Sequence, residues 1–254
     1  MIETVHLGKN FCAVRAVVDL NLKTNPGEIF GFLGPNGAGK TTTIKLISGL
    51  LRPSSGRVTV GGFDVVTHPV EAKKIMAYVP DAPQLYGKLT VEKFLKFIGA
   101  VYRLEPLTCR HAIGSFLELF GFADKRNELI ESLSHGTKQK VALAAAFMHE
   151  PLVLLMDEPL VGLDPRSARI LKDLLRQYAK RGATIFLSTH ILEVAERMCD
   201  RVGIIDKGQL VAVGAAEELK SKSGKEGESL EDLFLELTGG LEETEVLKFL
   251  RESP

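Results

Sequence analysis

Hydrophobic residues follow two different periods along this chain, and the change of period divides it into regions. Over residues 18–22 apolar and polar side chains alternate, which predicts a half-buried strand before a turn at 25–27. The continuous apolar run at 29–33 predicts a fully buried strand, which leads through a glycine-rich loop into a helix expected over 40–51. Alternating valines before the glycine pair at 61–62 indicate a hairpin. The first third is therefore expected to consist of strands and turns around one helix.

Between residues 82 and 137 the apolar period changes to that of an amphipathic helix. Apolar residues over 91–98 are spaced i, i+3, i+4 and i+7, and Thr90 stands where a helix N-cap is expected. The same spacing recurs over 113–120 and stops at Gly121, a residue typical of helix ends. We therefore expect 82–137 to be a helical insertion or subdomain.

From residue 138 onward, helical and extended patterns alternate. The expected elements are a helix around 141–149, a short buried strand at 152–156, a helix that starts after Asp164 and ends at Gly182, a strand at 184–187 and a helix over 191–198. Strands that alternate with helices are typical of α/β proteins with parallel strands. The sequence therefore predicts an α/β core.

The composition changes near the C-terminal end. Residues 217–229 are rich in Glu, Lys, Ser and Gly, which predicts a solvated linker. Ser229 begins a capping-box-like pattern, so a short helix is expected from there to the glycine pair at 239–240. A last amphipathic stretch lies within 241–254. We expect one main domain over 1–216, with 217–254 as linker and short helical tail.

Composition and charge narrow the class of protein. The 254 residues include 32 Lys+Arg and 32 Asp+Glu, and this balance argues against a protein that coats nucleic acid through bulk charge. The longest apolar run, at 141–148, is far below the about 20 residues of a membrane-spanning helix, and residues 1–6 do not resemble a secretory signal. The three cysteines have no C-x-x-C spacing and are expected to be reduced thiols. We expect a cytoplasmic protein that reaches a membrane only through a partner.

The glycine-rich loop fits a phosphate-binding motif. Its sequence is Gly34-Pro35-Asn36-Gly37-Ala38-Gly39-Lys40-Thr41, which matches G-x-x-x-x-G-K-[ST], and it lies between a predicted strand and a predicted helix. Glycines let backbone N–H groups turn toward phosphates, the helix N-terminus adds positive potential, and the lysine adds a full charge. The threonine hydroxyl can ligate Mg²⁺. This motif predicts a nucleotide site.

Two carboxylates follow a later buried strand. Asp157 and Glu158 come directly after the apolar run 152–156, and a strand of this kind fixes where the acids lie. Asp157 is then expected to hold Mg²⁺, directly or through water, and Glu158 to polarise an attacking water. Alone, such a pair also fits a surface turn after a core strand; together with the upstream loop it predicts a metal site.

A third segment narrows the family. Leu133-Ser134-His135-Gly136-Thr137-Lys138-Gln139-Lys140 resembles the LSGGQ signature of ABC ATPases, and Ser134 precedes Asp157 by 23 residues (157 − 134). Over residues 2–240 the chain resembles the ATP-binding subunit of an ABC transporter, and looks most like the single-domain ATPases paired with separately encoded exporter-type permeases. The resemblance implies a P-loop NTPase core with an antiparallel β subdomain and an inserted α-helical subdomain.

The resemblance also implies roles for individual residues. Residues 34–42, including Thr42, correspond to Walker A, with Lys40 neutralising phosphate charge and Thr41 with Asp157 holding Mg²⁺. Glu158 would be the catalytic base and His190 the switch histidine at the γ-phosphate. Phe11 falls where the family has an aromatic that stacks on adenine; a core aromatic is the alternative. Ser134, His135 and Gly136 would complete the ATP site of a second subunit, in a homodimer or a heterodimer.

The sequence departs from the family pattern at two places. Where the family has a Q-loop glutamine after an apolar strand, this chain has Asp81, which can reach Mg²⁺ or its waters; Gln84 can substitute for it, or Asp81 can be a turn residue. His135 and Thr137 replace a glycine and a glutamine of the signature. These departures leave open a nucleotide-dependent binding module with little turnover.

The implied function is an ATPase that dimerises around Mg·ATP and drives transport through a separate membrane permease, at the cytoplasmic face of the cell membrane. The permease would dock near residue 81 and the helical subdomain. Nucleic acid is not expected as a partner. The alternative is a soluble ABC ATPase of an assembly complex, such as the iron–sulfur type, which would act without a permease.

Overall fold

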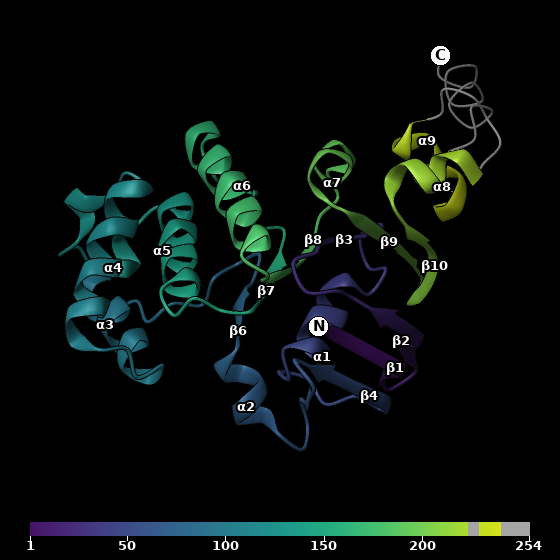
Figure 1. Cartoon of the computed structure of the whole chain (residues 1–254), viewed down its shortest axis with the longest axis horizontal. Helices are drawn as coiled ribbons and strands as arrows, with labels where there is room; N and C mark the ends of the chain where they lie inside the picture. The colour runs from purple at the N-terminus through teal and green to yellow at the C-terminus, as the bar shows by residue number, and fades with distance from the viewer. Residues whose placement is uncertain (223–228, 240–254) are drawn as a thin grey trace, which may run out of the picture.

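Two β-sheets of opposite character organise the chain in the computed structural model, which describes residues 1–222 and 229–239 (Figure 1). One sheet is antiparallel and has the strand order β2 (Val14–Lys23), β1 (Ile2–Phe11), β4 (Ser55–Val60), β5 (Phe63–Asp64). The other has the order β10 (Gln209–Gly214), β9 (Arg201–Asp206), β3 (Ile29–Leu33), β8 (Thr184–Ser188), β7 (Val153–Asp157), β6 (Met76–Val79). The predicted α/β class with an antiparallel β part is confirmed.

The second sheet is parallel apart from its edge strand β10, which runs antiparallel to β9. Every residue of β3, β7 and β8 is buried, because helices cover both faces of a parallel sheet. Burial on both faces of the sheet explains why the apolar runs of these three strands are continuous in the sequence. Parallel strands end at one edge, so the loops that follow β3, β6, β7 and β8 come together there, as is usual for ligand sites in such sheets.

The helices fall into two groups. Outside the 82–137 region and before the C-terminal part lie α1 (Lys40–Ile47), α2 (Pro69–Lys74), α6 (Pro165–Lys180) and α7 (Leu192–Met198). The region predicted to be a helical insertion contains α3 (Val91–Val101), α4 (Pro106–Leu119), the 3₁₀ turns η1 (Ala123–Lys125) and η2 (Ile130–Ser132), and the start of α5 (His135–Phe147). Figure 1 shows α3, α4 and α5 together at one end of the molecule. Their apolar faces share one core with β6 and β7.

The C-terminal part corrects one prediction. The solvated linker expected over 217–229 is wrong for 217–222, because α8 (Ala216–Lys222) occupies this stretch. Ala216 and Leu219 are buried in a small core with apolar residues of β9 and of α9 (Leu230–Thr238). The short helix expected after Ser229 is confirmed with its capping box. The rest of the predicted linker, 223–228, and the amphipathic stretch at 241–254 lie outside the described residues.

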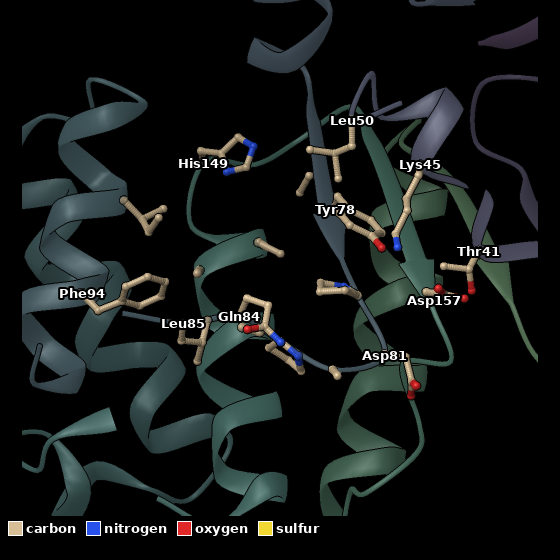
Figure 2. Close-up of a pocket in the computed structure, with 18 of the residues that line it drawn as sticks. Thr41, Lys45, Leu50, Tyr78, Asp81, Gln84, Leu85, Phe94, His149 and Asp157 are labelled. Carbon is tan, nitrogen blue, oxygen red and sulfur yellow. The ribbon is translucent and has the colours of Figure 1, made fainter. Parts of the chain in front are cut away.

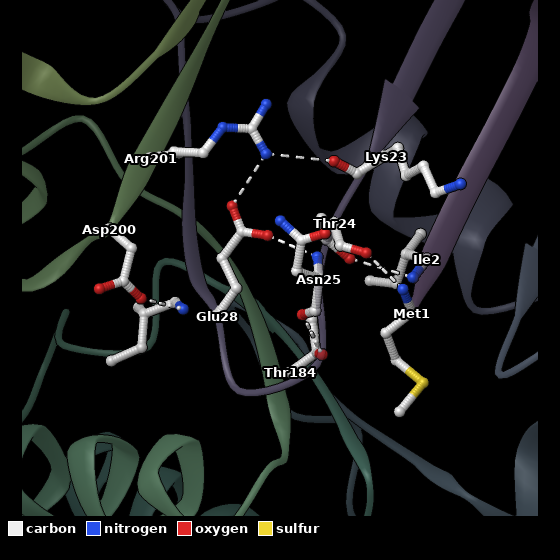
Figure 3. A network of polar contacts seen from close by, with 10 residues as sticks. Met1, Ile2, Lys23, Thr24, Asn25, Glu28, Thr184, Asp200 and Arg201 are labelled. Carbon is white, nitrogen blue, oxygen red and sulfur yellow. Dashed lines mark hydrogen bonds and ion pairs between the residues drawn. The ribbon is translucent and has the colours of Figure 1, made fainter. Parts of the chain in front are cut away.

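A buried polar network joins the two sheets (Figure 3). The Glu28 carboxylate is 5% exposed; it accepts a hydrogen bond from the Asn25 N–H and pairs with the Arg201 guanidinium at 3.0 Å. Arg201 also donates to the Lys23 carbonyl at the end of β2, and the amino group of Met1 donates to the Thr24 carbonyl. A buried carboxylate needs such partners to offset its desolvation. The network therefore fixes the end of β2 against the starts of β3 and β9, at the edge of the sheet opposite the one where the loops meet.

The described helices also bear on membrane insertion. Within residues 1–222 and 229–239, none combines the length and the apolar character required to cross a bilayer.

Candidate functional site

The loop at residues 34–39 joins the end of β3 to the start of α1. Gly37 and Gly39 have φ values of 80° and 108°, which glycine adopts without strain. A Cβ on Gly34 would lie 2.4 Å from the Ile205 carbonyl oxygen, and one on Gly39 would lie 2.4 Å from the Ala16 carbonyl oxygen. Both positions thus require glycine, because backbone from each sheet approaches the loop. The loop is held from both sides.

Lys40 is the first residue of α1 and is 8% exposed. Its Nζ donates to the carbonyl oxygens of Gly34, at 2.6 Å, and Pro35, at 3.1 Å. Burial lowers the pKa of this ammonium, and the negative charges of Glu158 and Asp157 partly oppose that effect. No side chain caps the N-terminus of α1, so its backbone donors remain available. The result is a buried cation beside free helix donors, an arrangement suited to phosphate.

The predicted acids lie at the end of β7, across from the end of β8. Asp157 pairs with Ser188 in the sheet, and the Ser188 hydroxyl donates to the Asp157 carboxylate at 2.5 Å. Asp157 is 3% exposed, and Figure 2 shows its carboxylate beside the Thr41 hydroxyl. The strand end therefore brings the two predicted metal ligands together from segments more than 100 residues apart in the chain.

Glu158 has a left-handed backbone, with φ of 48°, held by hydrogen bonds from its N–H to the Ser188 carbonyl and hydroxyl oxygens. One carboxylate oxygen lies 2.9 Å from Nδ1 of His190. The other, Oε2, is buried and contacts no donor in the described part of the chain. A buried acceptor without a partner is unusual, and near a cavity it is suited to a bound water or ligand. The structure thus brings Glu158 and His190 together, and their roles in hydrolysis stay predictions.

Two cavities adjoin at these residues. One, of about 520 Å³, is lined by the 36–42 part of the loop, Asp157, Glu158, Asp81 and the segments at 14–16 and 207–208. The other, of about 650 Å³, lies between the core and the helical region. Thr41, Asp81 and Asp157 line both. Figure 2 shows Asp81 near Asp157, and Gln84 further along the loop toward Leu85 and Phe94. Of the two candidates at the Q-loop position, Asp81 is therefore the one beside the acids.

The donor set fits a magnesium ion. Thr41, Asp157 and Asp81 offer only oxygen atoms, and Mg²⁺ prefers such ligands while keeping several waters. Within residues 1–222 and 229–239, no group of three or more His, Cys, Asp or Glu side chains could hold a metal ion by itself.

The signature segment lies elsewhere. Ser134 is the N-cap of α5, where its hydroxyl accepts from the Thr137 N–H at 3.3 Å and contacts the Thr137 hydroxyl. Ser134 and His135 are exposed, and neither they nor Gly136 line the cavity at the 34–42 loop. Within one chain, the structure does not bring the signature segment together with the loop.

Phe11 is likewise outside the cavity lining. It ends β1, is 44% exposed, and lies under the Lys9 ammonium, whose Nζ is 5.0 Å from the ring centroid. Its cross-strand partner Val14 does line the cavity. The core alternative for Phe11 is wrong, because the ring is exposed. Phe11 itself does not line the cavity, but the residue opposite it in the sheet does.

Sequence reasoning assigned no role to two residues of this edge. Ser188 orients Asp157 through a hydrogen bond, and the two residues are paired at the ends of the parallel strands β8 and β7. In the sequence, the signal for Ser188 is its place at the end of a predicted strand, just before His190. Tyr78 on β6 contributes a buried hydroxyl to the larger cavity, and burial, with the charges of Asp157 and Asp81, raises its pKa to about 12. Nothing in the sequence around Tyr78 distinguishes it from a core aromatic.

Comparison with known proteins gives a consistent set of matches. A family profile described as "ABC transporter" matches residues 17–161. The linearmycin resistance ATP-binding protein LnrL of Bacillus subtilis is 37% identical over 224 residues, which are 88% of this chain and 72% of that protein. The ABC transporter ATP-binding protein NatA of the same organism is 38% identical, covering 87% of this chain and 88% of that protein. The probable multidrug ABC transporter ATP-binding protein YbhF of Escherichia coli is 37% identical, but the match spans only 41% of its length.

Solved structures give the same result. An ATP-binding subunit of an ABC transporter superposes with a TM-score of 0.89 at 34% identity, covering 93% of this chain and 99% of that one. A dimeric ATP-binding cassette in a post-hydrolysis state, bound to ADP and Pi, has a TM-score of 0.78 at 24% identity and covers 85% of this chain and 98% of that one. The second likeness concerns the fold alone.

Proposed function

The chain belongs to the family of ABC transporter ATP-binding proteins, and from that premise we propose that it hydrolyses Mg·ATP in the cavity beside residues 34–42 and thereby drives a membrane permease. Binding and hydrolysis of ATP follow from the family. The assignment of individual residues, the metal and the partners is the proposed part.

One observation carries the residue assignment: the buried, unpaired Oε2 of Glu158 belongs to a carboxylate that lines the same cavity as Lys40. In this proposal Glu158 accepts a proton from the attacking water, and His190, 2.9 Å from Oε1, orients the carboxylate and contacts the γ-phosphate. Lys40 and the backbone N–H groups of 34–42 bind the phosphates and stabilise charge that develops during transfer.

The proposed ligands of Mg²⁺ are Thr41 and Asp157. The negative charge of Asp81 would add to the attraction for the ion. When bound, the ion neutralises phosphate charge and orients the phosphate oxygens. The Ser188 hydroxyl keeps the Asp157 carboxylate pointing toward this position. The fit of the oxygen donors supports this part of the proposal.

We infer a second chain because the signature segment lies outside the cavity at the 34–42 loop of its own chain. Ser134, His135 and Gly136 stand at a helix N-terminus, a favourable place for an anion, yet they lie outside the cavity of their own chain. Two chains arranged head to tail would place this segment over the partner's ATP. One of the structural neighbours, a cassette bound to ADP and Pi, is itself described as dimeric.

The permease is proposed to dock at the 650 Å³ cavity between core and helical region, at the cytoplasmic face of the membrane. Thr41, Asp81 and Asp157 belong to the walls of both cavities, so occupation of one can alter the other. The relatives are named as ATP-binding proteins of transporters, two of them for resistance or multidrug transport, and this supports transport over the assembly-complex alternative.

The test of the residue assignment is Glu158→Gln in the full chain. The change keeps the size of the side chain but removes the base, so phosphate release should fall at least about a hundredfold while ATP binding persists. Mg·ATP should then trap a dimer that elutes earlier in size-exclusion chromatography than wild type. A wild-type rate of phosphate release would sink the assignment.

Purification tests the partner. From detergent extracts of the source cells, the tagged chain should co-purify with an integral membrane protein that dissociates when the walls of the 650 Å³ cavity are altered, for example by Leu50→Arg, at an exposed position. Recovery with soluble proteins alone would favour the assembly-complex alternative.

A further inference from the structure

Helix α5 is fastened to the loop that carries Glu158. This loop, residues 158–164, runs from the end of β7 to the start of α6. Two consecutive residues of α5 contact it: Gln139 Nε2 donates to the Pro159 carbonyl in a long hydrogen bond of 3.5 Å, and Lys140 Nζ pairs with Asp164 Oδ2 at 2.7 Å. The same helix therefore holds the loop at both of its ends.

The middle of loop 158–164 also contacts the start of α5, where glycines allow a close approach. A Cβ on Gly136 would lie 2.6 Å from the Gly162 carbonyl oxygen, and one on Gly162 would lie 2.7 Å from Nδ1 of His135. Gly162 also has a φ of 78°, which favours glycine. The segment that bears Ser134 and the loop that bears Glu158 thus pack closely, with the Gly162 backbone against Gly136 and the His135 ring.

The Lys140–Asp164 contact is part of a larger anchor. Lys140 is only 15% exposed, and Asp164 caps α6 by accepting from the Ser167 N–H and hydroxyl. The hydrogen bond from Lys140, followed by those from Ser167, holds the pKa of Asp164 well below its usual range. The carboxylate therefore stays charged at neutral pH, and it ties the end of the loop to α5 and α6 together.

Gln139 is unusual because its burial is not matched by hydrogen bonds. The side chain is fully buried, yet its amide oxygen has no partner within the described residues. An unmet buried acceptor lowers stability, and an apolar side chain of the same shape would avoid that cost. The one hydrogen bond that the glutamine makes in return is the long one to the Pro159 carbonyl.

We propose that Gln139 and Lys140 are positioning residues that set the Glu158 loop against α5. Because α5 begins at the signature segment, a phosphate bound there would fix α5 and, through these two contacts, the position of the Glu158 carboxylate. The inference rests on the proposed use of Glu158 in hydrolysis. These contacts are therefore expected to affect the rate of ATP turnover and not the affinity for the nucleotide.

Gln139→Met separates this role from packing, because the two predict opposite results. Methionine fills the volume and removes the unmet acceptor, but it also removes the 3.5 Å hydrogen bond to the Pro159 carbonyl, so the melting temperature should change little. The kcat for ATP should nevertheless fall about tenfold, with KM within about twofold, since small displacements of a catalytic group are costly. A wild-type kcat in a folded Gln139→Met variant would overturn the role of Gln139.

The ion pair is tested by a set of variants at Lys140. Lys140→Met should lower kcat about tenfold and Lys140→Arg should restore it to within about twofold, because arginine keeps the charge and the reach. Asp164→Asn keeps the N-cap and removes the charge, so the double variant with Lys140→Met should be no slower than either single variant. Additive losses, or equal losses in Lys140→Arg and Lys140→Met, would overturn the role of Lys140.

Lys96→Met is the matched control, because it deletes a 2.8 Å ion pair with Glu92 on α3, and neither of these two residues lines either cavity. Its kcat should match wild type, and an equal loss there would overturn the inference. Glu158→Gln separates the two proposals. If it abolishes hydrolysis while the α5 variants turn over normally, the proposed function stands and the positioning role fails; if it hydrolyses normally, both fail.

Discussion

The 34–42 loop and the signature segment use the same element, a helix N-terminus, in opposite settings. Gly39, the N-cap of α1, has no side chain, and the Ala16 and Ile205 carbonyls surround the loop with backbone from both sheets. Ser134, the N-cap of α5, is exposed, and its hydroxyl is engaged by its own helix. The first N-terminus faces the cavity at the 34–42 loop, and the second lies outside that cavity.

The difference separates affinity from assembly. A site whose cation and backbone donors are already held in place binds phosphate with little reorganisation. A helix N-terminus that faces outward contributes only when an anion is brought to it. Changes in the loop should therefore act on the isolated chain, and changes in the signature segment only on the complex of two chains.

The largest expected effect is on nucleotide affinity. Lys40→Met removes the buried cation, so ATP affinity of the isolated chain should fall about a hundredfold, since a charged hydrogen bond contributes up to about 3 kcal/mol. Titration with a fluorescent ATP analogue measures this, with the surface variant Lys96→Met as control. Unchanged affinity would mean that the phosphates bind away from the loop, and would contradict the role of the loop in nucleotide affinity.

The next effect should appear only in the dimer. Ser134→Ala should leave the ATP affinity of the isolated chain within about twofold and weaken the ATP-dependent dimer about tenfold, as expected for loss of one hydrogen bond to a charged group. The lost N-cap should also cost about 1 kcal/mol of stability. Analytical ultracentrifugation with ATP in the Glu158→Gln background measures the dimer.

Ser134→Asp distinguishes the cap from the phosphate contact. Aspartate caps as well as serine, so stability should return, but its charge should oppose a phosphate and keep the dimer apart. A Ser134→Asp chain that dimerises like wild type would contradict a phosphate at this helix.

A smaller effect is expected at Phe11. Phe11→Ala should weaken ATP binding about fivefold, because aromatic stacking contributes about 1 kcal/mol, and should leave tripolyphosphate binding unchanged. Phe11→Tyr should keep the wild-type affinity for ATP. Since Phe11 is 44% exposed, the melting temperature should hardly move. Equal losses for ATP and tripolyphosphate would show that Phe11 acts on the loop and not on adenine.

The smallest effect is expected at Asp81. Asp81→Asn removes a negative charge beside Asp157, so the Mg²⁺ concentration for half-maximal hydrolysis should rise about threefold, because carboxylate count tunes the affinity of such sites. Gln84→Ala should leave it unchanged. The reverse result would assign the Q-loop role to Gln84.

The sequence predicted the fold best where short-range pattern and burial agree. The runs that became β3, β7 and β8 are fully buried, so their apolar character is unbroken. Strand β1 was missed, because its register with β2 shifts around His6, whose φ is positive, and the alternation breaks there. Helix α8 was missed because only Ala216 and Leu219 of its polar sequence are buried, too few to show a period.

For the site, motif spacing predicted the residues but not their contacts. The pairing of β7 with β8 brings Glu158 to His190, and this follows from strands whose order a single sequence does not state. The contacts of Gln139 and Lys140 with loop 158–164 depend on how α5 crosses that loop. Tertiary packing decides this, and no local period records it.

The central position of β3 has a consequence for the order of events during synthesis. Phe30 pairs with Phe186 on one side and Arg201 on the other, so the strand that leads into the phosphate loop gains both neighbours only from the last third of the chain. At about 5–20 residues per second, the ribosome needs roughly 10 to 35 s to extend the chain from β3 to β9. For that interval the motif is complete in sequence while its sheet is not. A nascent chain should acquire affinity for ATP abruptly, once β9 has been made.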